Sequence, residues 1–95
     1  MSHGQRVIWG KRVARQLAEL PPYIEKKFYA WAALIQLVGM RETRRAPGLH
    51  DEPLTGNRKG QRSIRLNRAY RAIYVERLEG RFEIVEVIEV NKHAY

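Results

Sequence analysis

The hydrophobic period of this chain changes from helical to alternating, and that change limits the fold more than any other feature. From Lys11 to Pro47 apolar residues recur at helical spacing, whereas from Gln61 onwards they alternate with polar ones as in β-strands. A run of helices followed by a run of strands is typical of α+β architectures. The sequence therefore predicts a small α+β fold of two layers, in which helices pack on one face of a sheet.

The first half of the chain predicts a strand and a helical hairpin. Residues 5–9, "QRVIW", form a short β-type run, and apolar residues then recur every three or four positions from 11 to 20. Pro22 suits the first position of a second helix, because its missing N–H lies among the donors that a helix start leaves free. A further helical turn is expected before Pro47. The apolar stripe of the second helix contains Ile24, Phe28, Trp31, Ile35 and Val38.

The second half predicts a loop followed by three antiparallel strands. Proline and glycine punctuate residues 46–60, which favours a loop. Alternation then marks strands at 61–67, 70–78 and 81–90, the last two joined by a tight turn at Glu79-Gly80.

One face of this sheet is expected to stay open. If the helical hairpin covers the face that carries Ile64 and Leu66, the opposite face must carry Ser63, Arg65 and Asn67.

Composition excludes several classes of function. The chain of 95 residues suits a single domain spanning 1–95, and it contains no cysteine for a disulfide or a thiolate metal site. It has no apolar run of the ~20 residues that cross a bilayer and no signal-peptide core, so we expect a cytoplasmic protein without a membrane partner. No motif predicts a cofactor, and no ligand spacing such as His-x-x-x-His supports a metal site.

The charge is strongly positive and is clustered. Lys and Arg number 18 against 10 Asp and Glu, which gives a formal charge of +8. Such a surface favours nucleic acid or an acidic protein as partner. No acid lies between Asn57 and Ile73, where Arg65 and Arg71 would stand on adjacent strands and bind phosphate through their planar guanidinium groups. The alternative is ordinary solvated strand charge paired with nearby glutamates. The other expected phosphate-binding residues are Arg58, Lys59, Arg62, Arg68 and Lys92.

The last residues add groups that exchange protons. If the final strand stays extended beyond Val90, Asn91, His93 and Tyr95 share one face next to the arginines, and His93 titrates near neutrality. The alternative is a frayed chain end.

The loop offers a second set of polar residues. His50, Asp51 and Glu52 follow one another, and a carboxylate there can orient an imidazole or act as a base itself. An ordinary solvated loop is the alternative.

Three motifs in this order, "PLTG", "SIRLNRAYRAIY" and "VNKHAY", resemble the RelE/ParE superfamily of bacterial toxins, most closely its HigB-like and RelE-like branch. The resemblance covers nearly the whole chain and implies the same order of one strand, a helical hairpin and three strands. It also implies a ribosome-dependent mRNA endoribonuclease that is inhibited by a cognate acidic antitoxin.

The resemblance also implies roles for individual residues. Arg65 and Arg71 match basic positions of the family. His93 falls where many members have a His or Arg after the last strand, and Tyr95 resembles the C-terminal Tyr. His50 is a second candidate for the base. Ser63 stands where some members have a Lys, so the cationic set is thinner on that strand.

The expected chemistry is attack of the RNA 2′-OH on the adjacent phosphate, which needs a base, an acid and cations but no metal. Two alternatives remain open: a ParE-like toxin that inhibits DNA gyrase, and a non-catalytic basic domain that binds nucleic acid.

Overall fold

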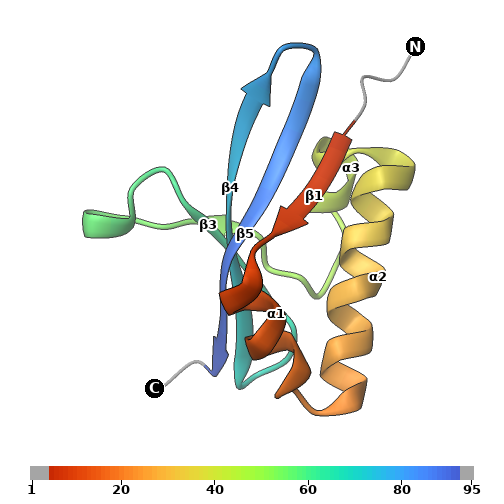
Figure 1. Ribbon diagram of the computed structural model, residues 1–95, viewed down its shortest axis with the longest axis vertical. Helices are drawn as coiled ribbons and strands as arrows, with labels where there is room; N and C mark the ends of the chain where they lie inside the picture. Colours follow the sequence, from red (N-terminus) through yellow and green to blue (C-terminus); the bar gives the residue numbers. More distant parts are fainter. Residues whose placement is uncertain (1–4, 93–95) are drawn as a thin grey trace.

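The structure, a computed structural model, describes residues 5–92 and contains the two predicted layers (Figure 1). The α+β fold is thereby confirmed. In chain order the elements are β1 (Gln5–Trp9), α1 (Lys11–Ala18), α2 (Pro22–Val38), α3 (Met40–Arg44), β2 (Glu52–Pro53), the 3-10 helix η1 (Gly56–Arg58), β3 (Arg62–Arg65), β4 (Tyr70–Glu79) and β5 (Phe82–Lys92).

The helices follow the local signals of the sequence. Pro22 occupies the start of α2, where its missing N–H costs nothing. Gly39 separates α2 from α3 with φ +88° and ψ 162°, a conformation that is essentially restricted to glycine. Val38 was expected on the buried stripe but is 45% exposed, because it lies in the last turn of α2, just before the chain changes direction. None of the helices between residues 5 and 92 is long and apolar enough to cross a membrane.

The five strands form one sheet in the order β1-β5-β4-β3-β2. β1 pairs in parallel with β5, and the other neighbours are antiparallel. A register shift between Ile73 and Tyr74 marks a bulge in the β4–β5 ladder. β5 continues beyond Val90 to Lys92, as the extended-strand expectation required.

The core lies between the helices and one face of the sheet. Phe28, Trp31 and Ile35 of α2 pack against strand residues that include Ile64 and Tyr74. The rings of Trp31 and Tyr74 lie 5.4 Å apart, centroid to centroid.

Several boundaries differ from the prediction. The loop contains β2 and η1, which are too short to show any hydrophobic period. β3 ends at Arg65 rather than 67, and the hairpin turn is Gly80–Arg81, one residue later than expected, because Glu79 still pairs with Phe82.

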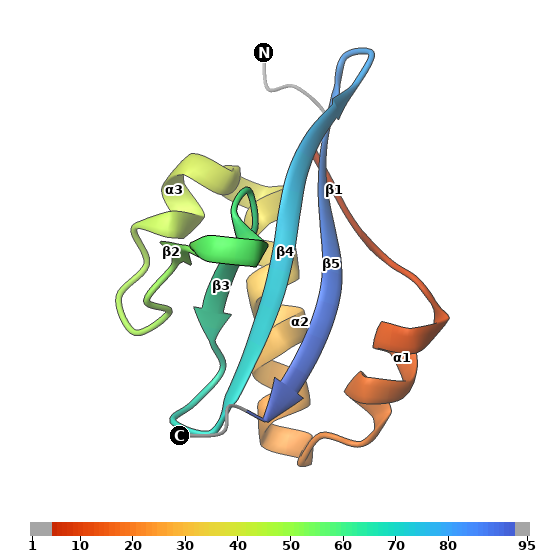
Figure 2. The ribbon, with the colours of Figure 1, turned by 90° about the vertical axis from the view of Figure 1, so that its left-hand side faces the viewer.

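The face opposite the helices is only partly open. Ser63 and Ile73, cross-strand partners on that face, are both buried, whereas Arg65 is exposed. η1 projects from this side of the sheet, as Figures 1 and 2 show, and its Arg58 bonds Glu89, the other cross-strand partner of Ile73. The loop that carries η1 therefore crosses part of the face that was expected to be open.

Candidate functional site

A polar cleft lies where β3 ends and β4 begins, beside the end of β5. Arginines dominate it, and one carboxylate is present. Its lining residues are Glu52, Ser63, Arg65, Asn67, Arg68, Tyr70 and Arg71.

Arg65 and Arg71 face each other directly across the β3–β4 ladder. Two like charges at opposite positions of a ladder repel, so this pair costs stability unless an anion joins it. Within residues 5–92 neither guanidinium has an acidic partner in an ion pair; Arg71 donates from Nε to Oδ1 of Asn91 at 3.3 Å. The pair is therefore a ready anion site, and its planar forks match a phosphate.

The turn between β3 and β4 is shaped by one side chain. Oδ1 of Asn67 accepts hydrogen bonds from the backbone N–H groups of Ala69 and Tyr70, at 2.7 and 2.8 Å. An Asn side chain commonly closes a turn in this way. Arg68 lies within this turn, so Asn67 brings a third guanidinium to the rim of the cleft.

A buried carboxylate anchors the segment that carries His50 and Glu52. The side chain of Asp51 is only 1% exposed; it accepts hydrogen bonds from the Tyr74 hydroxyl and from Nε of Arg62, the latter at 2.6 Å. Nε of Arg44 lies 4.0 Å away. Burial, and then the hydrogen bond and charge of Asp51, raise the pKa of Tyr74 well above its usual value. Burial lowers the pKa of Arg62, but the hydrogen bond and charge of Asp51 outweigh this, so the net shift is upward.

His50 and Glu52 flank this anchor and are both exposed. Glu52 pairs with Ser63 in the short β2–β3 ladder, which places its carboxylate on the wall of the cleft. The carbonyl of Leu49 accepts the backbone N–H of Arg65 at 2.7 Å, so His50 follows directly at the Arg65 end of β3. His50 has φ +46°, a conformation that non-glycine residues adopt mainly at turns and functional sites.

A chain of polar contacts runs from the cleft to η1. Asn91, which accepts from Arg71, donates to Glu89. Glu89 in turn pairs with Nη2 of Arg58 at 2.9 Å, and Nη1 of Arg58 donates to Gln61 at 3.0 Å. The orientation of Arg71 is thus coupled to the loop that crosses the sheet.

The structure separates the predicted cations into groups. Arg65, Arg68 and Arg71 meet at the cleft. Arg58 is engaged by Glu89, and Arg62 is engaged by Asp51 on the helix side of the sheet.

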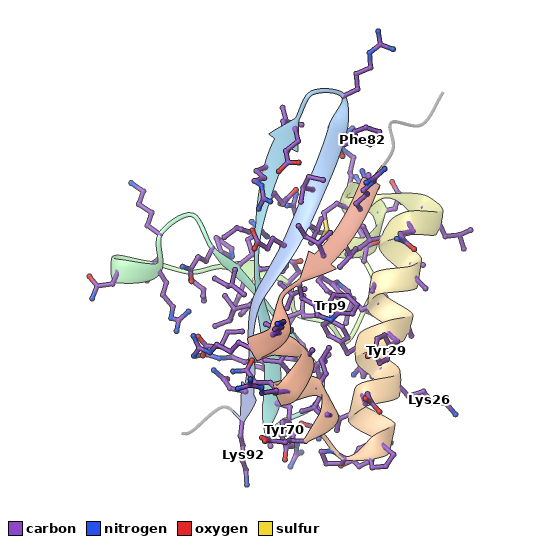
Figure 3. The ribbon with its side chains drawn as sticks, in the orientation of Figure 1. Trp9, Lys26, Tyr29, Tyr70, Phe82 and Lys92 are labelled. Atoms are coloured by element: carbon purple, nitrogen blue, oxygen red, sulfur yellow. The ribbon has the colours of Figure 1, made fainter. Side chains whose placement is uncertain are left out.

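The remaining predicted residues lie at the margins or beyond the structure. Lys59 is exposed after η1, and Lys92 is exposed at the end of β5, where Figure 3 shows it extending past the sheet. His93 and Tyr95 lie outside the described residues.

Strand alternation predicted Asn67 on the open face and Asn91 on the face next to the arginines, but it assigned neither a role. Their hydrogen bonds depend on the turn and on the β4–β5 register, which no residue pattern reveals. Among residues 5–92 no group of three or more His, Asp or Glu side chains is arranged to hold a metal ion.

Solved structures share this fold. No protein-family model and no curated protein matches the chain. A YoeB/ParE toxin from Agrobacterium tumefaciens superposes with a TM-score of 0.69 at 20% identity, covering 94% of this chain and 99% of that one. The archaeal RelE–RelB complex from Pyrococcus horikoshii OT3 gives 0.70 at 20% identity, covering 94% of each chain. The YoeB–YefM complex from Staphylococcus aureus gives 0.67 at 16%, covering 95% of this chain and 98% of that one.

Proposed function

We propose that this chain, which has the fold of the RelE/ParE toxins, is the toxin of a toxin-antitoxin pair and acts as an endoribonuclease on mRNA at the ribosome. The observation that carries the proposal is the pair of facing arginines, Arg65 and Arg71, in a cleft that also holds Glu52. For phosphodiester cleavage, two cations can bind the phosphate and a carboxylate can take the proton of the attacking hydroxyl. The branch within the superfamily, HigB-like or another, stays a prediction.

The arginines bind the scissile phosphate and stabilise the charge that grows on it. A dianionic phosphorane carries more negative charge than the ground-state diester, so fixed guanidinium groups favour the transition state over the substrate. Nε of Arg71 donates a hydrogen bond to Oδ1 of Asn91, which holds the guanidinium in place. The Nη groups of Arg71 are left for the phosphate.

A base beside the phosphate takes the proton of the 2′-OH, whose oxygen attacks the neighbouring phosphorus. The bond from phosphorus to the 5′-oxygen breaks, and an acid protonates that oxygen, which leaves a 2′,3′-cyclic phosphate and a 5′-hydroxyl. Glu52 is the base candidate that the cleft itself presents, and His50 is the second. This route requires no metal.

His93 is proposed as the acid, and Tyr95 as a stacking or proton-transfer partner. The support is positional: β5 runs beside Arg71 as far as Lys92, and His93 is the next residue of the sequence. Proton transfer of this kind contributes about 10²–10⁴ in rate.

We also propose two partners for the chain, an acidic antitoxin and ribosomal RNA. The solved neighbours include complexes of RelE with RelB and of YoeB with YefM, and the +8 charge of this chain favours an acidic antitoxin. The same charge favours docking on ribosomal RNA, which would hold the mRNA in reactive geometry for a small protein with few groups of its own.

The test is primer extension on a defined mRNA in a purified translation system, with and without ribosomes. We expect discrete cuts for the wild type, and rates lower by about 10²–10³ for Arg65→Ala and Arg71→Ala. Glu52→Gln and His93→Ala should each lose about 10²–10⁴. Arg81→Ala, in the exposed β4–β5 turn, is the matched control and should cut at the wild-type rate.

Two results would contradict the proposal. An intact message at protein levels that arrest growth would point instead to the ParE-like alternative, a toxin directed at gyrase. Salt-sensitive RNA binding without cleavage, unaffected by Glu52→Gln, would leave a non-catalytic nucleic-acid-binding domain.

A further inference from the structure

Helix α2 is apolar on two opposite sides, although only one of them is buried. Its inner side packs into the core through Ile24, Phe28, Trp31, Ala32 and Ile35. Its outer side also carries apolar residues, with Lys26 among them. α2 lies at the outside of the molecule and no other described element lies beyond it (Figure 1), so these apolar residues form a candidate interaction surface.

The exposed residues of the outer side have a defined spacing. Successive steps of three, four, three and four residues give the heptad pattern with which one helix packs along another. Tyr23 is 67% exposed and Leu37 is 80% exposed at the two ends. We call this set the outer stripe: Tyr23, Lys26, Ala30, Ala33 and Leu37.

The outer stripe is long enough for a helix and has a recess at one end. Its 14 residue steps correspond to about 21 Å, or four helical turns. A shallow, mainly apolar hollow adjoins its N-terminal end, lined by Pro22, Tyr23, Glu25, Lys26 and Tyr29. Such a hollow accepts a large apolar side chain from a partner helix.

Charge decides between possible occupants. Lys26 lies within the outer stripe and points away from the sheet (Figure 3), and Lys27 beside it is also exposed. Across the three helices the exposed cations outnumber the acids, so a second copy of this chain would bring a like-charged surface. The exposed cations are Lys11, Arg12, Arg15, Lys26, Lys27, Arg41 and Arg45, and the exposed acids are Glu19 and Glu42.

We propose that the outer stripe of α2 binds an acidic amphipathic helix of a partner protein, with the partner's apolar side chains along the stripe and its carboxylates beside Lys26 and Lys27. The assignment of that helix to the antitoxin rests on the proposed function, whereas the surface and its chemistry do not. The stripe lies on the side of the sheet opposite the Arg65–Arg71 face, so its occupant need not contact the cleft.

The experiment uses a designed helical peptide of about 20 residues, with Leu at the a and d positions of each heptad and Glu at the flanking positions. Binding to the full chain is followed by fluorescence anisotropy. We expect the wild type to bind the peptide, with affinity that falls as salt is added. The double variant Ala30→Glu/Ala33→Glu should bind at least tenfold more weakly. A matched double variant, Ala14→Glu/Ala18→Glu on the exposed side of α1, adds the same charge elsewhere and should bind within twofold of the wild type.

Several outcomes overturn the proposal. These are no binding by the wild type, equal binding of a peptide with Lys in place of Glu, and unchanged binding by Ala30→Glu/Ala33→Glu. A wild-type dimer in sedimentation velocity that the same variant dissociates would instead assign the stripe to a second copy. Circular dichroism checks that each variant is folded. The binding assay contains no RNA, so it tests this inference separately from the proposed function. If the peptide binds and the primer-extension experiment detects no cleavage, the proposed function is rejected and this inference stands.

Discussion

At the scale of single residues, Asp51 holds a short segment against the protein, and its two neighbours in that segment stay exposed. Its carboxylate is buried between Tyr74 and Arg62, while its neighbours His50 and Glu52 remain exposed. A buried carboxylate is stable only when hydrogen bonds and opposite charges replace its water, and Asp51 has both. The anchor therefore fixes the segment that presents Glu52 to the cleft.

Tyr74 makes this anchor sensitive to alkaline pH. Its pKa is raised in the folded state, so above the usual tyrosine pKa of about 10 the unfolded chain releases a proton that the folded chain keeps. Stability from this group is therefore full below about pH 10 and is lost as pH rises towards the folded-state pKa. We expect Tyr74→Phe to lose about 1.5–3 kcal/mol at pH 8. Above pH 10 the difference from wild type should shrink by up to about 1.4 kcal/mol per pH unit.

Urea unfolding of both proteins at a series of pH values measures this effect. Tyr23→Phe is the control, because Tyr23 is 67% exposed and its variant should keep the wild-type pH profile. Parallel profiles for the wild type and Tyr74→Phe would contradict the assigned role of the hydroxyl.

The roles of the arginines were only partly predictable at this scale. Strand alternation places Arg65 on the face opposite Ile64, and the structure adds that Arg71 is its direct partner across the β3–β4 ladder. The same alternation puts Arg62 on the helix side, where Asp51 binds it. That contact brings together a loop residue and a strand residue, so no pattern within either segment could reveal it.

At the scale of elements, periodic segments were predictable and short ones were not. α2 and β4 are long enough for a hydrophobic period to emerge, and their positions are confirmed. β2 has two residues and η1 has three, fewer than one period can show. Glu52 of β2 lines the cleft, and Arg58 of η1 bonds Glu89 on the face of the sheet. The sequence pattern therefore could not predict where these two residues lie.

The junction of α2 and α3 depends on the conformation of one glycine. Gly39 has φ +88° and ψ 162°, whereas Gly10, before α1, has φ −95° and ψ −171°, which any residue adopts. We therefore expect Gly39→Ser to lose about 1–3 kcal/mol of unfolding free energy. Gly10→Ser should be neutral or stabilising, since serine is a preferred residue at a helix N-cap.

Thermal and urea unfolding of the two variants compare the same substitution in two backbone conformations. A Cβ at position 39 would lie 3.5 Å from Nε2 of Gln5, an ordinary contact, so any loss reports the backbone rather than a clash. Equal stability of the two variants would contradict the conclusion that the backbone conformation at position 39 is strained for any residue other than glycine.

At the scale of the whole molecule, two basic surfaces lie on opposite sides of one sheet. The cleft offers converging guanidinium groups, whereas the helices expose separate cations around an apolar stripe. Converging arginines favour phosphate, and dispersed lysines beside apolar residues favour an acidic helix. Net charge alone predicted both partner classes without distinguishing their surfaces.

Salt dependence distinguishes the two surfaces. For an RNA oligonucleotide made uncleavable by 2′-deoxy substitution, the slope of log affinity against log salt falls by about 0.7 for each phosphate contact removed. We expect this change for Arg65→Ala and for Arg71→Ala, and none for Lys26→Ala or Lys27→Ala. Equal changes for all four would show that RNA binds over the whole basic surface.

The parallel pairing of β1 with β5 has a consequence for synthesis of the chain. Gln5 aligns with Glu83, so the first strand has no partner strand until translation has passed the β4–β5 hairpin. Arg71 likewise gains Asn91 only when β5 is complete. Contacts between segments so distant in sequence form late and slow folding. A nascent chain still being translated can pair β3 with β4, but it lacks the Asn91 contact that holds Arg71 and the strand that pairs with β1 until β5 has been added.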